Sequence, residues 1–219
     1  MPRTVTKQVY KFTELSDKAK AKAVEWYREL EMQETGWWDY VYEEADRIAD
    51  AFGITLNRSE AGKPMSGPDI LFSGFYSQGD GACFQGRYAS PQIPAVEGFA
   101  ALGIEDDNLK ALAVRLDALS AKTGGRLTTV VRHSGYYYHE YCTAFETELT
   151  DPEDGSDFDP YAYDVEDEKE LVDILRRFMK WIYRQLEEAD EARLSDETIT
   201  EALADSDYEF EASGAPTRD

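Results

Sequence analysis

Apolar residues recur at spacings of three and four along several stretches of the chain, which is the pattern of helices with one buried face. Ser16 is placed to cap the first stretch, and Ser195 to cap a short final one with Asp196 and Glu197 in its first turn. Gly53 and the Thr123–Gly125 segment are helix-stop signals. Helices are therefore predicted over residues 17–32, from near 36 to 53, around 109–122, over 165–189 and after Ser195, with a short helical turn within 89–105.

Other stretches alternate apolar and polar residues or are short and rich in β-formers, which indicates strands. Residues 69–76 and 82–88 flank a Gly- and Asp-rich turn, and residues 126–134 and 137–149 form a second predicted hairpin. In the last of these, residues with odd numbers share one face and glutamates recur on the other. With short strands at 4–12 and 54–56, these patterns predict an α+β protein: a mainly antiparallel sheet of about five strands with several packed helices, in a single domain.

The chain is long enough to bury a substantial core, and its composition is strongly acidic. It has 219 residues, 45 Asp and Glu against 23 Lys and Arg, and a formal net charge of −22. A charge of this sign argues against direct binding to nucleic acid or to an anionic membrane, because both require a basic surface. Only two cysteines, Cys83 and Cys142, are present, which suits a reducing interior, and no apolar run approaches the roughly 18 residues of a membrane helix. The first residues, MPRTVTKQVYKF, lack the apolar region of a secretion signal.

The negative charge is concentrated towards the C-terminus. Residues 1–139 contain 19 acids and 16 bases, whereas residues 140–219 contain 26 acids and 7 bases. The division predicted from this charge is an α+β core over 1–150, an acidic loop over 151–168, and a helical acidic region over 169–219 packed on the core. Such an asymmetry fits either a solvated surface or an interaction surface. The candidate partner-binding residues are Asp151, Glu153, Asp154, Asp157, Asp159, Asp164, Glu166, Asp167, Glu168, Glu187, Glu188, Asp190 and Glu191.

Motifs of known chemistry are missing. Neither a phosphate-binding loop nor a GxSxG nucleophile elbow occurs, and the acids of residues 151–159 do not match the register of a calcium-binding loop. His133 and His139 with Cys142 make a weak zinc signal, so no metal, cofactor or catalytic residue is assigned. An enzyme site assembled from Asp80, His133, Tyr138 and His139 stays open as a hypothesis, to be judged by whether these side chains come within hydrogen-bonding reach.

Tyrosines gather at two places. Tyr136, Tyr137 and Tyr138 lie at the second predicted hairpin, where strand packing explains them. Tyr161 and Tyr163 lie within the acidic run, where a core position is harder to justify. Aromatic side chains beside charge are common at protein interfaces, because they bring contact area at a low entropic cost.

Several segments together resemble a family of small proteins from tailed-bacteriophage and prophage genomes. They are residues 12–29, 37–54, 70–88, 181–191 and 200–214, of which the FSGFxSQGDGAxF block at 72–84 is the most specific. The resemblance implies a phage protein acting in the cytoplasm of a bacterial host. It supplies no catalytic residues, and some shorter relatives carry a loose antitoxin label that rests on the N-terminal helical region.

Charge and resemblance together favour a non-enzymatic inhibitor that binds a host protein with a basic nucleic-acid-binding surface, such as a CRISPR effector or a restriction nuclease, by DNA mimicry. One alternative is an antitoxin-like or scaffolding protein whose contacts are mostly apolar and whose acidic region only keeps it soluble. A second is a small enzyme of unrecognised type. A sheet with exposed edges and a long amphipathic helix would also suit a homodimer.

Overall fold

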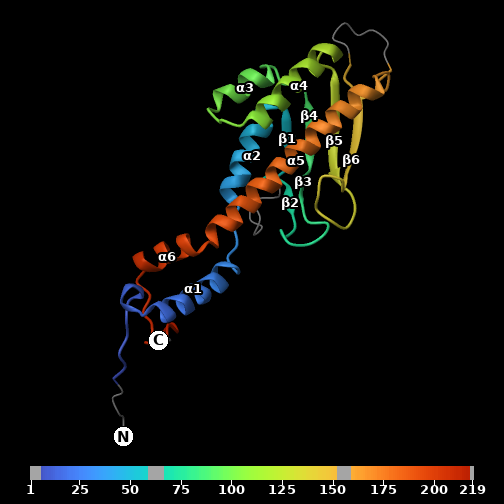
Figure 1. Ribbon diagram of the computed structural model, residues 1–219. Helices are drawn as coiled ribbons and strands as arrows, with labels where there is room; N and C mark the ends of the chain where they lie inside the picture. Colours follow the sequence, from blue (N-terminus) through green and yellow to red (C-terminus); the bar gives the residue numbers. More distant parts are fainter. Residues whose placement is uncertain (1–5, 59–66, 152–158, 218–219) are drawn as a thin grey trace. The chain divides into compact units, whose positions relative to one another are not determined.

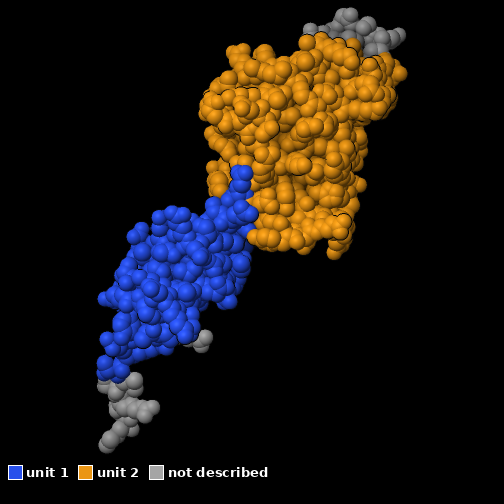
Figure 2. Space-filling model, in the orientation of Figure 1, with its two compact units in different colours: residues 1–38, 188–219 blue, residues 39–187 orange. Residues whose placement is uncertain are grey.

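The computed structural model describes residues 6–58, 67–151 and 159–217 (Figure 1). Contacts divide the chain into two compact units, coloured separately in Figure 2. Unit 1 comprises residues 1–38 and 188–219, and unit 2 comprises residues 39–187. The predicted α+β class with antiparallel sheets is confirmed. The sequence divisions at 150 and 168 followed charge, whereas the two units follow contacts.

Unit 2 contains both sheets, and every strand pair in them is antiparallel. The larger sheet has the order β1-β4-β5-β6, and a smaller one pairs β2 with β3. The strands are β1 (Ile54–Leu56), β2 (Ile70–Phe72), β3 (Ala82–Phe84), β4 (Gly86–Ala89), β5 (Leu127–His133) and β6 (Thr143–Leu149).

The segment predicted as one strand over 82–88 is two strands, so that prediction was wrong at Gln85. β3 pairs with β2, whereas β4 pairs with β1 and β5, and the chain passes from one sheet to the other at this residue. Gly86 permits the passage, because a Cβ at this position would lie 2.3 Å from the carbonyl oxygen of Thr55. The close approach of two backbones here requires glycine.

The helices of unit 2 largely follow the predicted apolar stripes. They are α2 (Asp39–Ala51), α3 (Ala95–Ala101), α4 (Asp107–Thr123) and α5 (Val165–Arg193), the last of which belongs to unit 2 as far as Glu187. Gly53 (φ +75°) and Gly124 (φ +62°) follow α2 and α4 in the left-handed region, as a helix stop requires. α5 is four residues longer than the predicted 165–189.

Helix α5 supplies the centre of the core of unit 2 and crosses the strands in Figure 1. The ring of Phe178 lies 5.7 Å from that of Phe52 on the α2 side and 6.0 Å from that of Phe84 in β3. It also stacks on Trp181, whose indole N–H donates a 2.9 Å hydrogen bond to Asp106 at the start of α4. The Phe178 side chain thus packs α5 against Phe52, which follows α2, and against β3 of the smaller sheet.

Unit 1 is a small helical unit. It contains a 3-10 turn η1 (Phe12–Glu14), α1 (Asp17–Glu31), the end of α5 and α6 (Asp196–Asp205). Ser16 and Ser195 cap α1 and α6 as predicted, each accepting a hydrogen bond from a backbone N–H of the first turn. The buried cluster of this unit is Phe12, Leu15, Ala19, Ala23, Ile199, Leu203 and Phe210.

Three further predicted strands were wrong in extent. The strand predicted over 69–76 covers only Ile70–Phe72. Residues 6–12 form no strand, because within the described chain Tyr10 makes a single isolated bridge, to Phe210; residues 1–5 lie outside the described residues. The strand predicted from Tyr137 begins at Thr143, and the preceding residues turn instead, with Cys142 donating its N–H to the carbonyl of His139. From Thr143 onward the predicted alternation of buried and exposed residues is observed.

Candidate acidic interface

The thirteen candidate acids fall into three groups. Asp151, Asp159 and the acids from Asp164 to Glu187 lie in unit 2, and Glu188, Asp190 and Glu191 lie in unit 1. Glu153, Asp154 and Asp157 lie outside the described residues. Asp151 and Asp159 are exposed, and Asp159 accepts a hydrogen bond from the N–H of Tyr161.

Most of the acids at the start of α5 form ion pairs within unit 2. Lys122, at the end of α4, lies 3.6 Å from Asp164 and also pairs with Asp167, which is only 7% exposed. Glu166 pairs with Lys169 at 2.7 Å. Acids in the first turn are favourable because the helix dipole is positive there, and a hydrogen bond from the N–H of Glu166, with Lys122 nearby, lowers the pKa of Asp164. This cluster therefore fixes the start of the helix, and part of its charge is already neutralised.

The acids at the far end of α5 are similarly divided. Asp190 is 6% exposed and accepts a 2.6 Å ion-pair contact from Arg193. The same guanidinium donates to the carbonyl of Glu31 and lies 4.6 Å above the ring of Trp37, so Asp190 has a structural role in unit 1. Glu191 is exposed, and no cation of the described chain lies within ion-pair distance of it.

A regular row of carboxylates lies instead on α6, which the candidate set did not include. Glu197, Glu201 and Asp205 are all exposed, and none forms an ion pair with a described cation. Residues four apart in an α-helix are neighbours on one face, separated by about 6 Å along the axis. The four-residue spacing was readable in the sequence, but the denser acidic run at 151–168 outweighed it.

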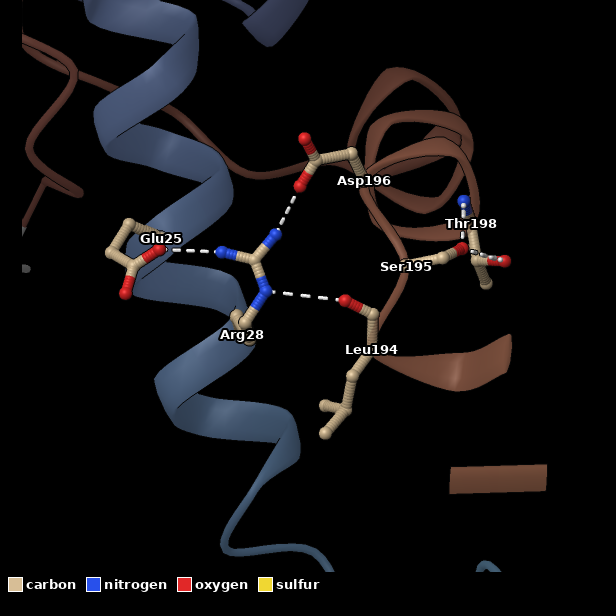
Figure 3. A network of polar contacts seen from close by, with 6 residues as sticks. All are labelled: Glu25, Arg28, Leu194, Ser195, Asp196 and Thr198. Carbon is tan, nitrogen blue, oxygen red and sulfur yellow. Dashed lines mark hydrogen bonds and ion pairs between the residues drawn. The ribbon is translucent and has the colours of Figure 1, made fainter. Parts of the chain in front are cut away.

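Arg28 of α1 holds the start of α6 in place (Figure 3). Its guanidinium donates to Glu25 of its own helix, to Asp196 and, through Nε at 3.1 Å, to the carbonyl of Leu194. At the same end of α6, the Ser195 hydroxyl accepts a hydrogen bond from the backbone N–H of Thr198. Ile199 and Leu203 are buried in the core of unit 1, so the row of Glu197, Glu201 and Asp205 is left on the exposed side.

A second exposed surface is aromatic and lies in unit 2. Tyr136 is 87% exposed and Tyr76 is 84% exposed, and Tyr137, Tyr138 and Tyr141 are also exposed. The prediction of strand packing for residues 136–138 was therefore wrong, because these residues lie in the β5–β6 loop. That loop contacts the 73–81 loop: a Cβ on Gly79 (φ +97°) would lie 3.0 Å from the ring of Tyr137.

The groups of the hypothetical enzyme site do not form a hydrogen-bonded cluster, although the ring of His133 lies 5.1 Å from that of Tyr138. Asp80 accepts the backbone N–H groups of Tyr76 and Ser77, which is the role of a turn residue. His133 contacts the carbonyl of Tyr137 at 3.1 Å, and His139 lies 3.5 Å from the sulfur of Cys142. Asp80, His133, Tyr138 and His139 are all described, and no hydrogen bond links their side chains to one another.

No group of three or more His, Cys, Asp or Glu side chains in residues 6–58, 67–151 and 159–217 is placed to hold a metal ion. In that same part of the chain, no helix combines the length and apolar character needed to cross a bilayer.

The protein is therefore of the α+β class. It exposes a row of carboxylates in unit 1 and a group of tyrosines in unit 2. A family model described as a domain of unknown function, DUF8835, matches residues 37–196, and the chain belongs to that family. The family carries no assigned activity. Comparison with curated proteins gave no match. Comparison with solved structures gave none either.

Proposed function

We propose that this chain is a phage-encoded, non-enzymatic inhibitor that occupies the basic nucleic-acid-binding surface of a host defence protein. The observation that carries the proposal is the exposed carboxylate row Glu197, Glu201 and Asp205 on α6. The row belongs to a strongly acidic segment, because residues 188–219 contain eleven acids and two bases. The resemblance to phage proteins supplies the setting, which is the cytoplasm of a bacterial host.

The spacing of the row supports mimicry of one DNA strand. Carboxylates four residues apart repeat about every 6 Å along α6. Phosphates of one DNA strand repeat about every 3.4 Å along the duplex axis. The row therefore offers roughly half the linear charge of one strand, held on a rigid scaffold. A basic groove would meet it with lysine and arginine side chains that otherwise bind phosphates.

The expected target is a nuclease of a bacterial defence system, such as a CRISPR effector or a restriction enzyme. Association steered by charge is fast and weakens steeply as salt rises, because the attraction acts over about one Debye length. The protein itself would bind no nucleic acid, since its own net charge is −22. Inhibition should therefore compete with DNA and fall with ionic strength.

The test compares two variants of equal charge. One is E197Q/E201Q/D205N on α6, and the control is E43Q/D50N/E97Q, which removes three exposed acids of unit 2. Each is assayed for protection of plasmid DNA from a panel of CRISPR effectors and restriction nucleases at 50 and 300 mM salt. We expect the α6 variant to lose at least about tenfold in inhibition and the control to stay near wild type. Equal inhibition by both variants, or inhibition insensitive to salt, would contradict the mimicry.

The exposed tyrosines favour a second candidate, an antitoxin-like or scaffolding protein with mainly aromatic contacts. Loops rich in Tyr, Ser and Gly are typical of protein-binding surfaces, and the 73–81 and 134–142 loops have this composition. A complex formed in this way would survive high salt. It would be lost in Y76S/Y136S and unaffected by E197Q/E201Q/D205N, which is the opposite of the result expected for the acidic inhibitor.

A further inference from the structure

Strand β6 lies at one edge of the larger sheet. It pairs with β5 on one side and, within the described residues, with no strand on the other. Backbone hydrogen bonds show which residues face β5: Ser134 donates to Cys142 and Thr150 donates to Arg126, so the even-numbered residues of this strand are directed towards its partner. The odd-numbered residues then direct their N–H and C=O groups outward.

Among the described residues, a backbone hydrogen bond covers only one end of this edge. The outward N–H of Leu149 donates to the carbonyl of Pro160 at 2.7 Å. The outward N–H and C=O groups of Phe145 and Thr147 form no hydrogen bond with any described residue. Natural edge strands are commonly blocked by proline, by charged side chains, especially lysine, or by a bulge. Residues 143–147 contain no proline, lysine or bulge, and their single charged side chain is Glu146. The open stretch has room for about five residues of an added strand.

A groove of about 530 Å³ lies along α5, next to the loop that leads into β6. Its walls include four cations of α5, Lys169, Arg176, Arg177 and Lys180, with Tyr141 from that loop. Three carboxylates, Glu140, Glu168 and Asp173, line it as well. Arg176 joins the groove to the strand, because its guanidinium lies 5.0 Å from the ring centre of Tyr141 and 5.3 Å from that of Phe145.

The groove is far less acidic than the segment around it, because its lining has four bases against three acids. Residues 140–219 contain seven bases, and four of them line it. Lys169 and Arg177 are paired with Glu166 and Asp173. Arg176 and Lys180 form no ion pair with a described carboxylate, and the Nε of Arg176 is buried without a hydrogen-bond partner among the described residues.

We propose that this surface binds an extended, acidic segment of a partner protein by strand addition. The segment pairs its backbone with the outward groups of Phe145 and Thr147. Its alternate side chains project over the groove, where Asp or Glu meets Arg176 and Lys180. Main-chain pairing gives such complexes affinity, and alternate side chains give them specificity.

A second copy of this chain fits the surface poorly. A strand supplied by another β6 would bring Thr143, Phe145 and Thr147 over the groove, none of which is acidic. The exposed Glu146 and Glu148 of the two copies would lie together on the opposite face, where like charges repel. The two cations without a described ion-pair partner, Arg176 and Lys180, therefore favour a partner segment with acidic side chains.

The test uses the full-length protein and a displayed library of random twelve-residue peptides. We expect the enriched peptides to carry Asp or Glu at alternate positions. Their affinity should fall at least about tenfold in R176Q/K180Q and stay within about twofold in the control R47Q/R184Q, which removes the same charge from exposed positions outside the groove. N-methylation of alternate peptide residues should abolish binding in one register and leave it intact in the other, which is the signature of strand pairing.

Three results would overturn the proposal. One is a library in which no acidic sequence is enriched, or in which the enriched peptides bind R176Q/K180Q as tightly as wild type. Another is binding of a twelve-nucleotide oligo(dT) that depends on Arg176 and Lys180, which would make the groove a single-strand nucleic-acid site. The third is a concentration-dependent dimer in sedimentation velocity that Phe145→Pro abolishes, which would assign the edge to a second copy. None of these readouts involves α6, so they are independent of the inhibitor test.

Discussion

Phe210 closes the small core of unit 1, and truncating it to alanine should unfold that unit locally. The side chain is fully buried, and its ring meets those of Phe12 at 6.4 Å and Trp26 at 5.8 Å in edge-to-face contacts. Replacing a buried phenylalanine by alanine costs about 3–5 kcal/mol, because the lost transfer energy adds to the cavity left behind. The seven-residue cluster around it offers few side chains that could close such a cavity.

This loss is large for a unit of this size. Unit 1 contains 70 residues. At roughly 0.05–0.15 kcal/mol per residue, its stability would be about 3.5–10 kcal/mol. A loss of about 4 kcal/mol corresponds to nearly a thousandfold increase in the open population, at 1.4 kcal/mol per factor of ten. Amides of α1 and α6 should lose hydrogen-exchange protection by about that factor.

The measurement is hydrogen exchange with mass spectrometry on the full-length F210A protein. Tyr208→Ala is the matched control, since Tyr208 also contacts Trp26, at 5.2 Å, but is exposed. It should cost less than about 1 kcal/mol. Peptides of α4 report on unit 2 and should keep their protection, because the cluster around Phe210 is drawn entirely from unit 1. The reasoning fails if F210A changes α1 and α6 by less than tenfold, or if α4 loses protection equally.

Three further predictions concern single residues. Gly214→Ala should destabilise unit 1 by more than about 2 kcal/mol in urea unfolding. Gly214 has φ +85°, and a Cβ added there would lie 2.1 Å from the carbonyl oxygen of Ala19. Unchanged stability would contradict this. Arg115→Ala should destabilise unit 2 at pH 7 but differ little from wild type near pH 3. The hydrogen bond from Arg115 lowers the pKa of Glu170 in the folded protein, so its stabilisation is present above the unfolded pKa of Glu170 and is lost as the pH falls through the folded pKa. A loss of stability that persists at pH 3 would refute this linkage. Cys142 should react with a thiol reagent at pH 8 well before Cys83, since burial raises the pKa of Cys83 to about 12, and equal labelling of both in the folded protein would exclude this.

The acidic side chains of this protein include buried, ion-paired residues and exposed ones. Asp167 and Asp190 are buried and paired with Lys122 and Arg193, so substituting them tests folding rather than binding. Glu197 and Glu201 are exposed and carry no ion pair with the described cations, so substituting them tests binding. A mutational survey of this protein should keep the two sets apart.

Local signals in the sequence were sufficient for most of the helices. Ser16 and Ser195 cap α1 and α6, and Gly53 and Gly124 stop α2 and α4, because a cap or a positive φ depends on a few adjacent residues. The apolar stripe of α5 was equally clear, since burial of one helical face imposes its own period. The hairpin of β2 with β3 also followed from its Gly-rich turn.

Strand extents needed the fold. Tyr10 looked like part of a strand, but a strand exists only where a partner runs beside it, and here one bridge to Phe210 is all that is available. Gln85 divides the segment predicted as one strand over 82–88 into β3 and β4, because the residues before and after it pair with different strands. Pairing is a property of segments distant in the chain, which periodicity within one segment does not encode.

The sequence by itself determined the amount of charge, its concentration in the last 80 residues and the helical faces that carry it. Only the tertiary structure decided which charges are available: Asp167 is buried against Lys122 of a distant helix, whereas the row from Glu197 to Asp205 is left exposed. It also placed Arg176 beside Tyr141 and Phe145, next to an open strand edge. The reason is that the energy of a charge depends on the solvent and counter-charges that surround it, and those are fixed only when distant segments pack together.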